Sequence, residues 1–177
     1  MIQSNTMYGV KTMVPASGCN LVGYIDCNVN SLMPSLDQVK NSIYSIEKEQ
    51  REKLIILLSH IGGIVNPDIY EISELCRQEK IILLEDCAHS FGSTLNGKHT
   101  GLFGDAGVYS FYATKSIPAG EGGVVVTNNQ ELGKMTALSF PVIMLPCLVV
   151  TGFAIWYLNK GIRSLTGLSS EDIFMIK

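Results

Sequence analysis

The chain has 177 residues, of which 46% are hydrophobic and 16% charged, enough apolar material for one packed domain with an appendage. This composition excludes intrinsic disorder as a description of the whole chain. Thirteen basic and sixteen acidic residues give a formal net charge of −3, and no basic stripe marks a nucleic-acid-binding face. The N-terminal residues do not form a basic segment followed by an apolar stretch, so we expect a cytoplasmic protein without a secretory signal.

The five cysteines are odd in number, widely spaced and free of any C-x-x-C pair. Such spacing argues against a disulfide framework and favours reduced thiols. Four residues that could donate to a metal also lack the spacing of a known zinc site: His60, Cys87, His89 and His99. We therefore expect no metal centre.

Residues 1–134 alternate short apolar runs with amphipathic stretches. The runs 54–58 and 81–84 are apolar throughout, which is typical of strands buried on both faces of a sheet. Residues 34–53 and 67–80 place apolar side chains at helical spacing. The expected strands are 21–25, 54–58, 81–84, 108–112 and 124–126. Strands that alternate with helices predict βαβ units, so the fold class is α/β with a mainly parallel sheet.

The last part of the chain, residues 135–177, has a different character. Residues 139–158 contain no charge and are long enough, as a helix, to cross a bilayer core of about 30 Å. Pro141 and Pro146 would each remove a helical hydrogen bond and kink such a helix. The prolines favour an apolar helix that packs against another domain or subunit, and a membrane span through 139–158 stays the alternative.

Polar residues that could take part in binding or catalysis lie between residues 85 and 123. Asp86 directly follows an apolar run, and ligands of α/β sheets bind at the carboxyl ends of strands. Taken alone, Asp86 is more often a solvated residue at a strand end, and Ser110 and Lys115 are similarly unspecific. Only their order along the chain makes them informative.

Three segments in that order resemble the DegT/DnrJ/EryC1/StrS family of pyridoxal-phosphate (PLP) sugar aminotransferases. The segments are 85–92 (EDCAHSFG), 109–115 (YSFYATK) and 120–128 (GEGGVVVTN), with weaker similarity in 58–63 (LSHIGG). The resemblance covers roughly residues 1–135. It implies the large domain of the aspartate-aminotransferase fold (PLP fold type I), truncated at both ends, with residues 1–134 as the cofactor-binding core and 135–177 as an apolar helical segment or the start of a small domain.

The resemblance also implies roles for individual residues. Lys115 matches the lysine that carries PLP and moves a proton, and Asp86 matches the aspartate that faces the pyridine nitrogen. His89 matches the position that contacts the 3-oxygen of the ring, and Ser110 matches a serine that binds the cofactor phosphate. These four residues are the predicted site, with PLP as the cofactor.

The implied activity is PLP-dependent transamination of a nucleotide-linked keto-sugar by an amino-acid donor, in amino-sugar or cell-surface polysaccharide biosynthesis, with a homodimer as the full-length enzyme. Related sugar dehydratases replace the cofactor lysine with histidine, so Lys115 favours transamination. The family's Gly-[ST] phosphate-binding turn has no counterpart here, and Met7 follows Thr6 where the family tends to place an aromatic residue. We therefore expect weak or no activity from this chain alone. A non-catalytic member of the family and a membrane-tethered protein are the alternatives.

Overall fold

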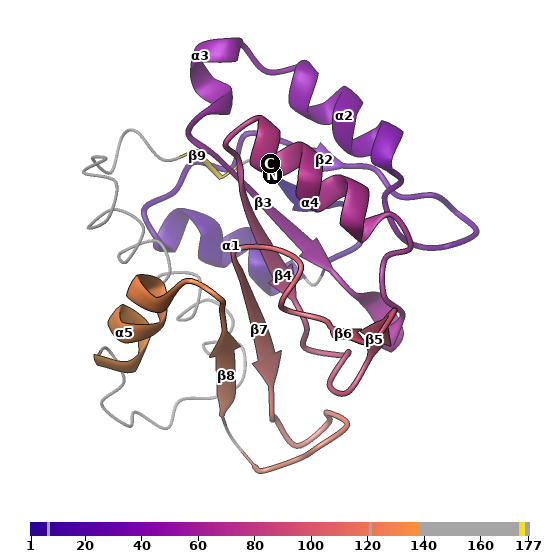
Figure 1. Cartoon of the computed structure of the whole chain (residues 1–177), viewed down its shortest axis with the longest axis vertical. Coiled ribbons are helices and arrows are strands. Elements are labelled where there is room, and N and C mark those ends of the chain that lie inside the picture. Colours follow the sequence, from indigo (N-terminus) through magenta and orange to yellow (C-terminus); the bar gives the residue numbers. More distant parts are fainter. Residues whose placement is uncertain (7, 121, 139–173, 176–177) are drawn as a thin grey trace.

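The apolar runs of the sequence become the strands of one mixed sheet (Figure 1). The computed structural model describes residues 1–6, 8–120, 122–138 and 174–175. The strands are β1 (Ile2–Gln3), β2 (Tyr24–Ile25), β3 (Leu54–Ser59), β4 (Ile82–Asp86), β7 (Ala106–Ser110), β8 (Gly123–Val126) and β9 (Phe174–Met175). Their order is β2-β1-β3-β4-β7-β8, and β9 pairs with β3. All of these pairs are parallel except β7 with β8, which confirms the predicted α/β fold with a mainly parallel sheet.

Helices cover both faces of this sheet (Figure 1). They are α1 (Tyr8–Ala16), α2 (Leu36–Tyr44), α3 (Lys48–Arg51), the 3-10 turn η1 (Ile61–Gly63), α4 (Ile69–Gln78) and α5 (Gln130–Leu138). A two-stranded hairpin, β5 (Thr94–Leu95) and β6 (Lys98–His99), lies outside the sheet.

Strand β3 divides the core into two clusters because its side chains alternate between the two faces of the sheet. All six residues of β3 are buried. Leu54, Ile56 and Leu58 pack with the apolar faces of α2 and α4, whereas Ile55 and Leu57 pack with residues of α1 and with Leu132 of α5. The result is a three-layer α/β/α arrangement around a sheet buried on both faces, as the continuous apolar runs predict.

The parallel register brings polar residues from different strands to one edge. Ser59, the last residue of β3, pairs with Asp86, the last residue of β4. Asp86 pairs in turn with Val108 of β7, two residues before Ser110. The carboxyl ends of β3, β4 and β7 therefore meet at the edge where α/β sheets bind ligands.

The predicted helix over 34–53 is interrupted. A capping box between Ser35 and Gln38 starts α2 as the pattern suggests, but Ser45 ends the helix and Glu47 is extended before α3. The side chain of Ile46 is buried in the core, and the Arg51 Nε donates to the Ile46 carbonyl at 2.8 Å. Burying the Ile46 side chain in the core therefore stabilises the fold more than continuing α2 through residue 46 would.

The division of the chain at residue 134 stays a prediction. Helix α5 continues to Leu138, and the apolar segment 139–158 lies outside the described residues. Within the described ranges, no helix has both the length and the apolar character needed to cross a bilayer.

Candidate active site

Asp86 ends β4 with its carboxylate held by a donor on each oxygen. Its Oδ2 accepts a hydrogen bond from the Ser59 hydroxyl at 3.1 Å, and its Oδ1 accepts from the Ala88 backbone N–H at 3.1 Å. A carboxylate has about four acceptor positions, so with respect to the described residues each oxygen retains room for a further donor. The half-buried side chain is thus an oriented acceptor at the carboxyl edge of the sheet.

Ser110 and Lys115 follow on the neighbouring strand and its loop. Ser110 ends β7, is buried, and accepts a hydrogen bond from the Tyr112 backbone N–H at 3.4 Å. Lys115 is half-buried in the loop between β7 and β8, where its backbone N–H donates to the Tyr112 carbonyl at 2.9 Å. The loop leaves β7 at its carboxyl end (Figure 1). The structure therefore places Asp86, Ser110 and Lys115 at one end of the sheet.

His89 lies in the turn that follows β4, and its side chain is exposed. This turn approaches the turn after β3 very closely. A Cβ at Gly63 would lie 3.0 Å from the His89 carbonyl oxygen, and Gly63 has a φ of +82°. Both the contact and the backbone conformation favour glycine. Gly63 thus allows the turn that carries His89 to lie against the end of β3.

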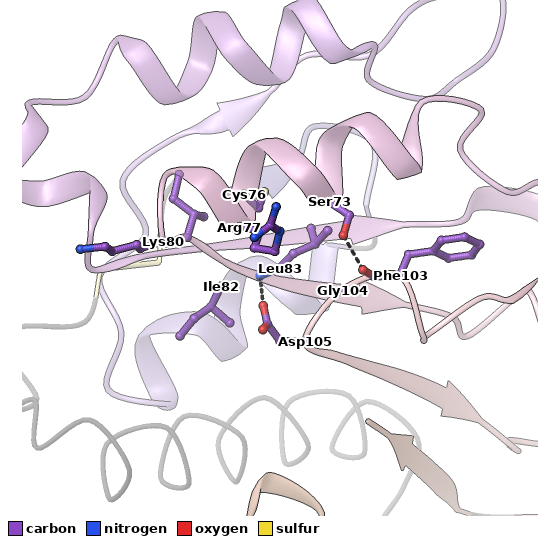
Figure 2. Close-up of a pocket in the computed structure, with 10 residues that line it drawn as sticks. Ser73, Cys76, Arg77, Lys80, Ile82, Leu83, Phe103, Gly104 and Asp105 are labelled. Atoms are coloured by element: carbon purple, nitrogen blue, oxygen red, sulfur yellow. Dashed lines mark hydrogen bonds between the residues drawn. The ribbon is translucent and has the colours of Figure 1, made fainter. Parts of the chain in front are cut away.

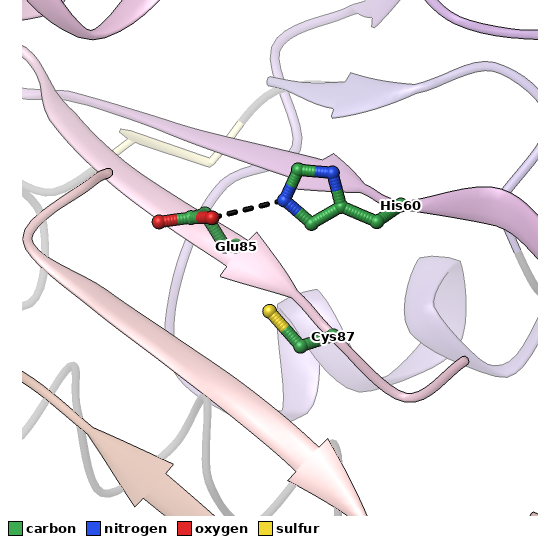
Figure 3. A group of neighbouring side chains, drawn as sticks. All are labelled: His60, Glu85 and Cys87. Carbon is green, nitrogen blue, oxygen red and sulfur yellow. Dashed lines mark hydrogen bonds and ion pairs between the residues drawn. The ribbon is translucent and has the colours of Figure 1, made fainter. Parts of the chain in front are cut away.

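A buried hydrogen-bonded cluster lies directly behind the site. The Glu85 carboxylate accepts hydrogen bonds from the backbone N–H groups of Gly101, Phe103 and Gly104 at 2.6–2.7 Å. The His60 Nε2 lies 2.9 Å from the Glu85 Oε2 (Figure 3), and both side chains are fully buried. Four donors fill the acceptor capacity of this carboxylate.

The tautomer of His60 follows from its second contact. The Asn66 backbone N–H donates to the His60 Nδ1 at 3.3 Å, so Nδ1 carries no proton. The proton is then on Nε2, which donates it to Glu85. Glu85 consequently ties the 101–104 loop to β4, while His60 ties the 60–66 turn to the same carboxylate.

His60, Glu85 and Cys87 also form a group whose potential ligand atoms lie within 4.8 Å of one another (Figure 3). Two of these three side chains, His60 and Glu85, already use their potential ligand atoms in hydrogen bonds. A metal would have to displace backbone donors from Glu85, or the Asn66 N–H from His60, inside the core. Through these hydrogen bonds, His60 and Glu85 act as a structural clamp that holds the 60–66 turn and the 101–104 loop to β4.

Burial controls the reactivity of the cysteines. In the described part of the chain, Cys19, Cys27, Cys76 and Cys87 carry free thiols, and only Cys27 is not fully buried. Desolvation raises the pKa of Cys76 to about 12 and raises the pKa of Cys87 well above its usual range. Because the thiolate is the reactive form, both thiols are protected at neutral pH.

We expect a short iodoacetamide pulse at pH 8 to modify Cys27 at least about tenfold faster than Cys76 or Cys87 in the folded chain. Peptide mapping by mass spectrometry gives the three rates separately. Denaturation in guanidinium is the control and should equalise them. Equal rates in the folded protein would contradict the buried positions of Cys76 and Cys87.

A cavity of about 390 Å³ lies at the opposite, amino end of the sheet (Figure 2). Ser73 donates to the Phe103 carbonyl in its wall, and the Asp105 carboxylate accepts from the Leu83 backbone N–H at 2.8 Å. The Ser73 hydroxyl and the Asp105 carboxylate therefore already form hydrogen bonds with backbone groups. None of the four predicted site residues lines this cavity.

Comparison with known proteins supplies the family. The model of the DegT/DnrJ/EryC1/StrS aminotransferase family matches residues 1–152. The chain belongs to this family. It is 34% identical over 125 residues to GDP-perosamine synthase of Escherichia coli O157:H7, covering 70% of this chain and 34% of that enzyme. The chain thus spans about a third of the length of this curated relative.

Solved structures of the family share the fold. A DegT DnrJ EryC1 StrS aminotransferase from Brucella abortus superposes with a TM-score of 0.70 at 21% identity, covering 94% of this chain and 47% of that one. A GDP-4-keto-6-deoxymannose-3-dehydratase with a trapped PLP-glutamate geminal diamine gives a TM-score of 0.60 at 22% identity, covering 94% and 48%. The predicted family and the PLP fold type I architecture are confirmed.

The roles of Lys115, Asp86, His89 and Ser110 stay predictions, but the structure adds contacts to Asp86 that the sequence did not indicate. Ser59 contacts Asp86, and Thr6 Oγ1 lies 3.0 Å from the Ser59 Oγ. The signal for Ser59 was weak: a polar residue that ends an apolar run, as Asp86 does.

Proposed function

We propose that this protein takes part in the PLP-dependent transamination of a nucleotide-linked keto-sugar, with an amino acid as donor. The observation that carries the proposal is the Asp86 carboxylate, oriented at the carboxyl end of β4 beside the strand and loop that hold Ser110 and Lys115. Family membership supports PLP as the cofactor. The relative named GDP-perosamine synthase supports a nucleotide-linked sugar as the substrate class.

The residues present fit this cofactor chemically. Asp86 offers a negatively charged acceptor with unused lone pairs for a protonated ring nitrogen. Lys115 offers a primary amine on a flexible stem, and Ser110 ends a strand whose backbone leads into the Lys115 loop. When bound, PLP supplies an electron sink for the charge that develops on the substrate carbon.

The chain's own side chains then have distinct tasks. Asp86 holds a proton on the ring nitrogen through its carboxylate. Lys115 Nζ holds the cofactor and afterwards moves the proton taken from the substrate carbon, acting as base and then as acid. Ser110 and the neighbouring backbone would bind the phosphate, and His89 would contact the 3-oxygen of the ring. A cytoplasmic location and a homodimer stay predictions of the sequence.

Borohydride reduction of the chain incubated with PLP tests this assignment. We expect the pyridoxyl label on Lys115, because this lysine occupies the matching loop at the end of β7, and we expect loss of most label in Lys115→Arg. Lys98→Arg is the matched control, since Lys98 is also half-buried but lies in the separate β5–β6 hairpin. Peptide mapping locates the label, and a label concentrated on another lysine would overturn the assignment.

The same experiment separates the alternatives. Label on Lys115 together with amino-group transfer from glutamate supports the aminotransferase. Label on Lys115 without any transfer agrees with the weak or absent activity expected of this chain alone and shows that the chain by itself is non-catalytic. The dehydratase reading is disfavoured by Lys115 itself, and loss of an oxygen substituent from the sugar without amino transfer would restore it.

A further inference from the structure

Asp86 is the last acceptor in a chain of hydroxyl groups that begins in a different part of the sequence. Ser59 Oγ lies 3.1 Å from Asp86 Oδ2 and 3.0 Å from Thr6 Oγ1. Ser59 is 3% exposed and is the direct cross-strand partner of Asp86. Thr6, Ser59 and Asp86 thus connect the segment after β1 with the ends of β3 and β4.

The direction of the two hydrogen bonds that join Thr6, Ser59 and Asp86 follows from which groups can donate and which can only accept. An ionised carboxylate only accepts hydrogen bonds, so the single hydroxyl proton of Ser59 points to Asp86. The Ser59 oxygen is then an acceptor toward Thr6, and Thr6 must be the donor in that contact. Each bond in such a series polarises the next and strengthens it.

Ser59 itself is fixed from a third strand. Its backbone N–H donates to the Gln3 Oε1 at 3.1 Å, and Gln3 is completely buried in β1. The Gln3 Nε2 donates in turn to the Asn5 Oδ1 at 2.7 Å and the Leu32 carbonyl at 3.3 Å. The hydroxyl donor to Asp86 therefore has little freedom to move.

These contacts set the plane of the Asp86 carboxylate. Ser59 occupies one position on Oδ2, and the Ala88 N–H occupies one on Oδ1. With a donor on each oxygen, rotation of the carboxylate would break at least one bond. The unused lone pairs are held in a fixed direction, which is what an ion pair with a planar ring nitrogen requires.

We propose that Thr6 and Ser59 are positioning residues for Asp86, which hold its carboxylate in the orientation that keeps the pyridine nitrogen of PLP protonated. The inference rests on the proposed function and deepens it. It assigns to this site two residues that act through Asp86, and it predicts a change in the bound cofactor and not only in the stability of the fold.

The test compares Ser59→Ala and Thr6→Val with wild type, each loaded with PLP. The readouts are the dissociation constant for PLP and the pH at which the absorption band of the bound cofactor changes. We expect Ser59→Ala to weaken PLP binding roughly tenfold and to lower that pH by about one unit, since a loosely held carboxylate retains the ring proton less well. Thr6→Val should act in the same direction but less strongly.

Two further variants distinguish positioning from a structural effect. Thr6→Ser retains the hydroxyl and should restore wild-type behaviour. Ser73→Ala is the matched control, since the Ser73 hydroxyl donates to the Phe103 carbonyl near the amino end of the sheet. It should leave both cofactor readouts unchanged. Thermal unfolding of every variant shows whether each fold is intact.

The outcomes separate this inference from the proposed function. If wild type binds PLP on Lys115 and Ser59→Ala behaves like Ser73→Ala, the positioning role is wrong and the proposed function stands. If Ser59→Ala changes only the unfolding temperature, the role is likewise wrong. If wild type takes up no PLP, the proposed function fails and this inference fails with it.

Discussion

Replacement of Asp86 by asparagine should slow any amino transfer that the chain catalyses by about 100-fold or more, while PLP binding falls much less. The amide is neutral and cannot hold a proton on the ring nitrogen, so the loss concerns charge that develops in the transition state. The amide oxygen can accept from the Ala88 N–H, and the Ser59 hydroxyl can rotate to accept from the amide NH₂, so the local structure is retained. Single-turnover absorption measurements with PLP-loaded protein and glutamate give the rate.

Asp105→Asn is the matched control for this experiment. Asp105 lies just before β7, at the amino end of the sheet, and its carboxylate accepts from the Leu83 backbone N–H. An asparagine oxygen can accept the same bond, so the rate should stay within about twofold of wild type. An unchanged rate in Asp86→Asn, with PLP shown on Lys115, would refute the role of Asp86.

Replacement of Glu85 by glutamine should lower the free energy of unfolding by about 3 kcal/mol. The carboxylate accepts from three backbone N–H groups and from His60, all in the buried core. In glutamine one oxygen becomes an NH₂ group, which must face at least one of these donors. The lost bonds and the unpaired donors both destabilise the folded state.

Guanidinium unfolding followed by circular dichroism measures this loss. Glu74→Gln is the control, because the exposed Glu74 pairs with the solvent-exposed Arg77 and Gln78 on α4, and its replacement should leave the unfolding midpoint nearly unchanged. A loss below about 1 kcal/mol in Glu85→Gln would show that the Glu85 cluster is not a structural clamp. PLP binding should weaken in proportion to the loss of folded protein.

The sequence alone determined the fold class and predicted the region of the candidate site. The continuous apolar runs predict strands buried on both faces, because such runs leave no polar side for solvent, and β3 and β4 confirm it. The placement of Asp86 at a strand end follows from the same pattern. The order of the segments around Asp86, Ser110 and Lys115 was specific enough to indicate the family, which a match over residues 1–152 confirms.

The neighbours of Asp86 were decided by the tertiary structure. Ser59 is 27 residues away in sequence, and only the parallel register of β3 and β4 places the two side by side. Glu85 is next to Asp86 and also carries a carboxyl group, yet its side chain is fully buried. Strand alternation sends the two carboxylates to opposite faces of the sheet, and the 101–104 loop closes over Glu85 alone. Sequence periodicity contains local spacing only, whereas these contacts depend on the pairing of distant segments, which the packing of the whole core determines.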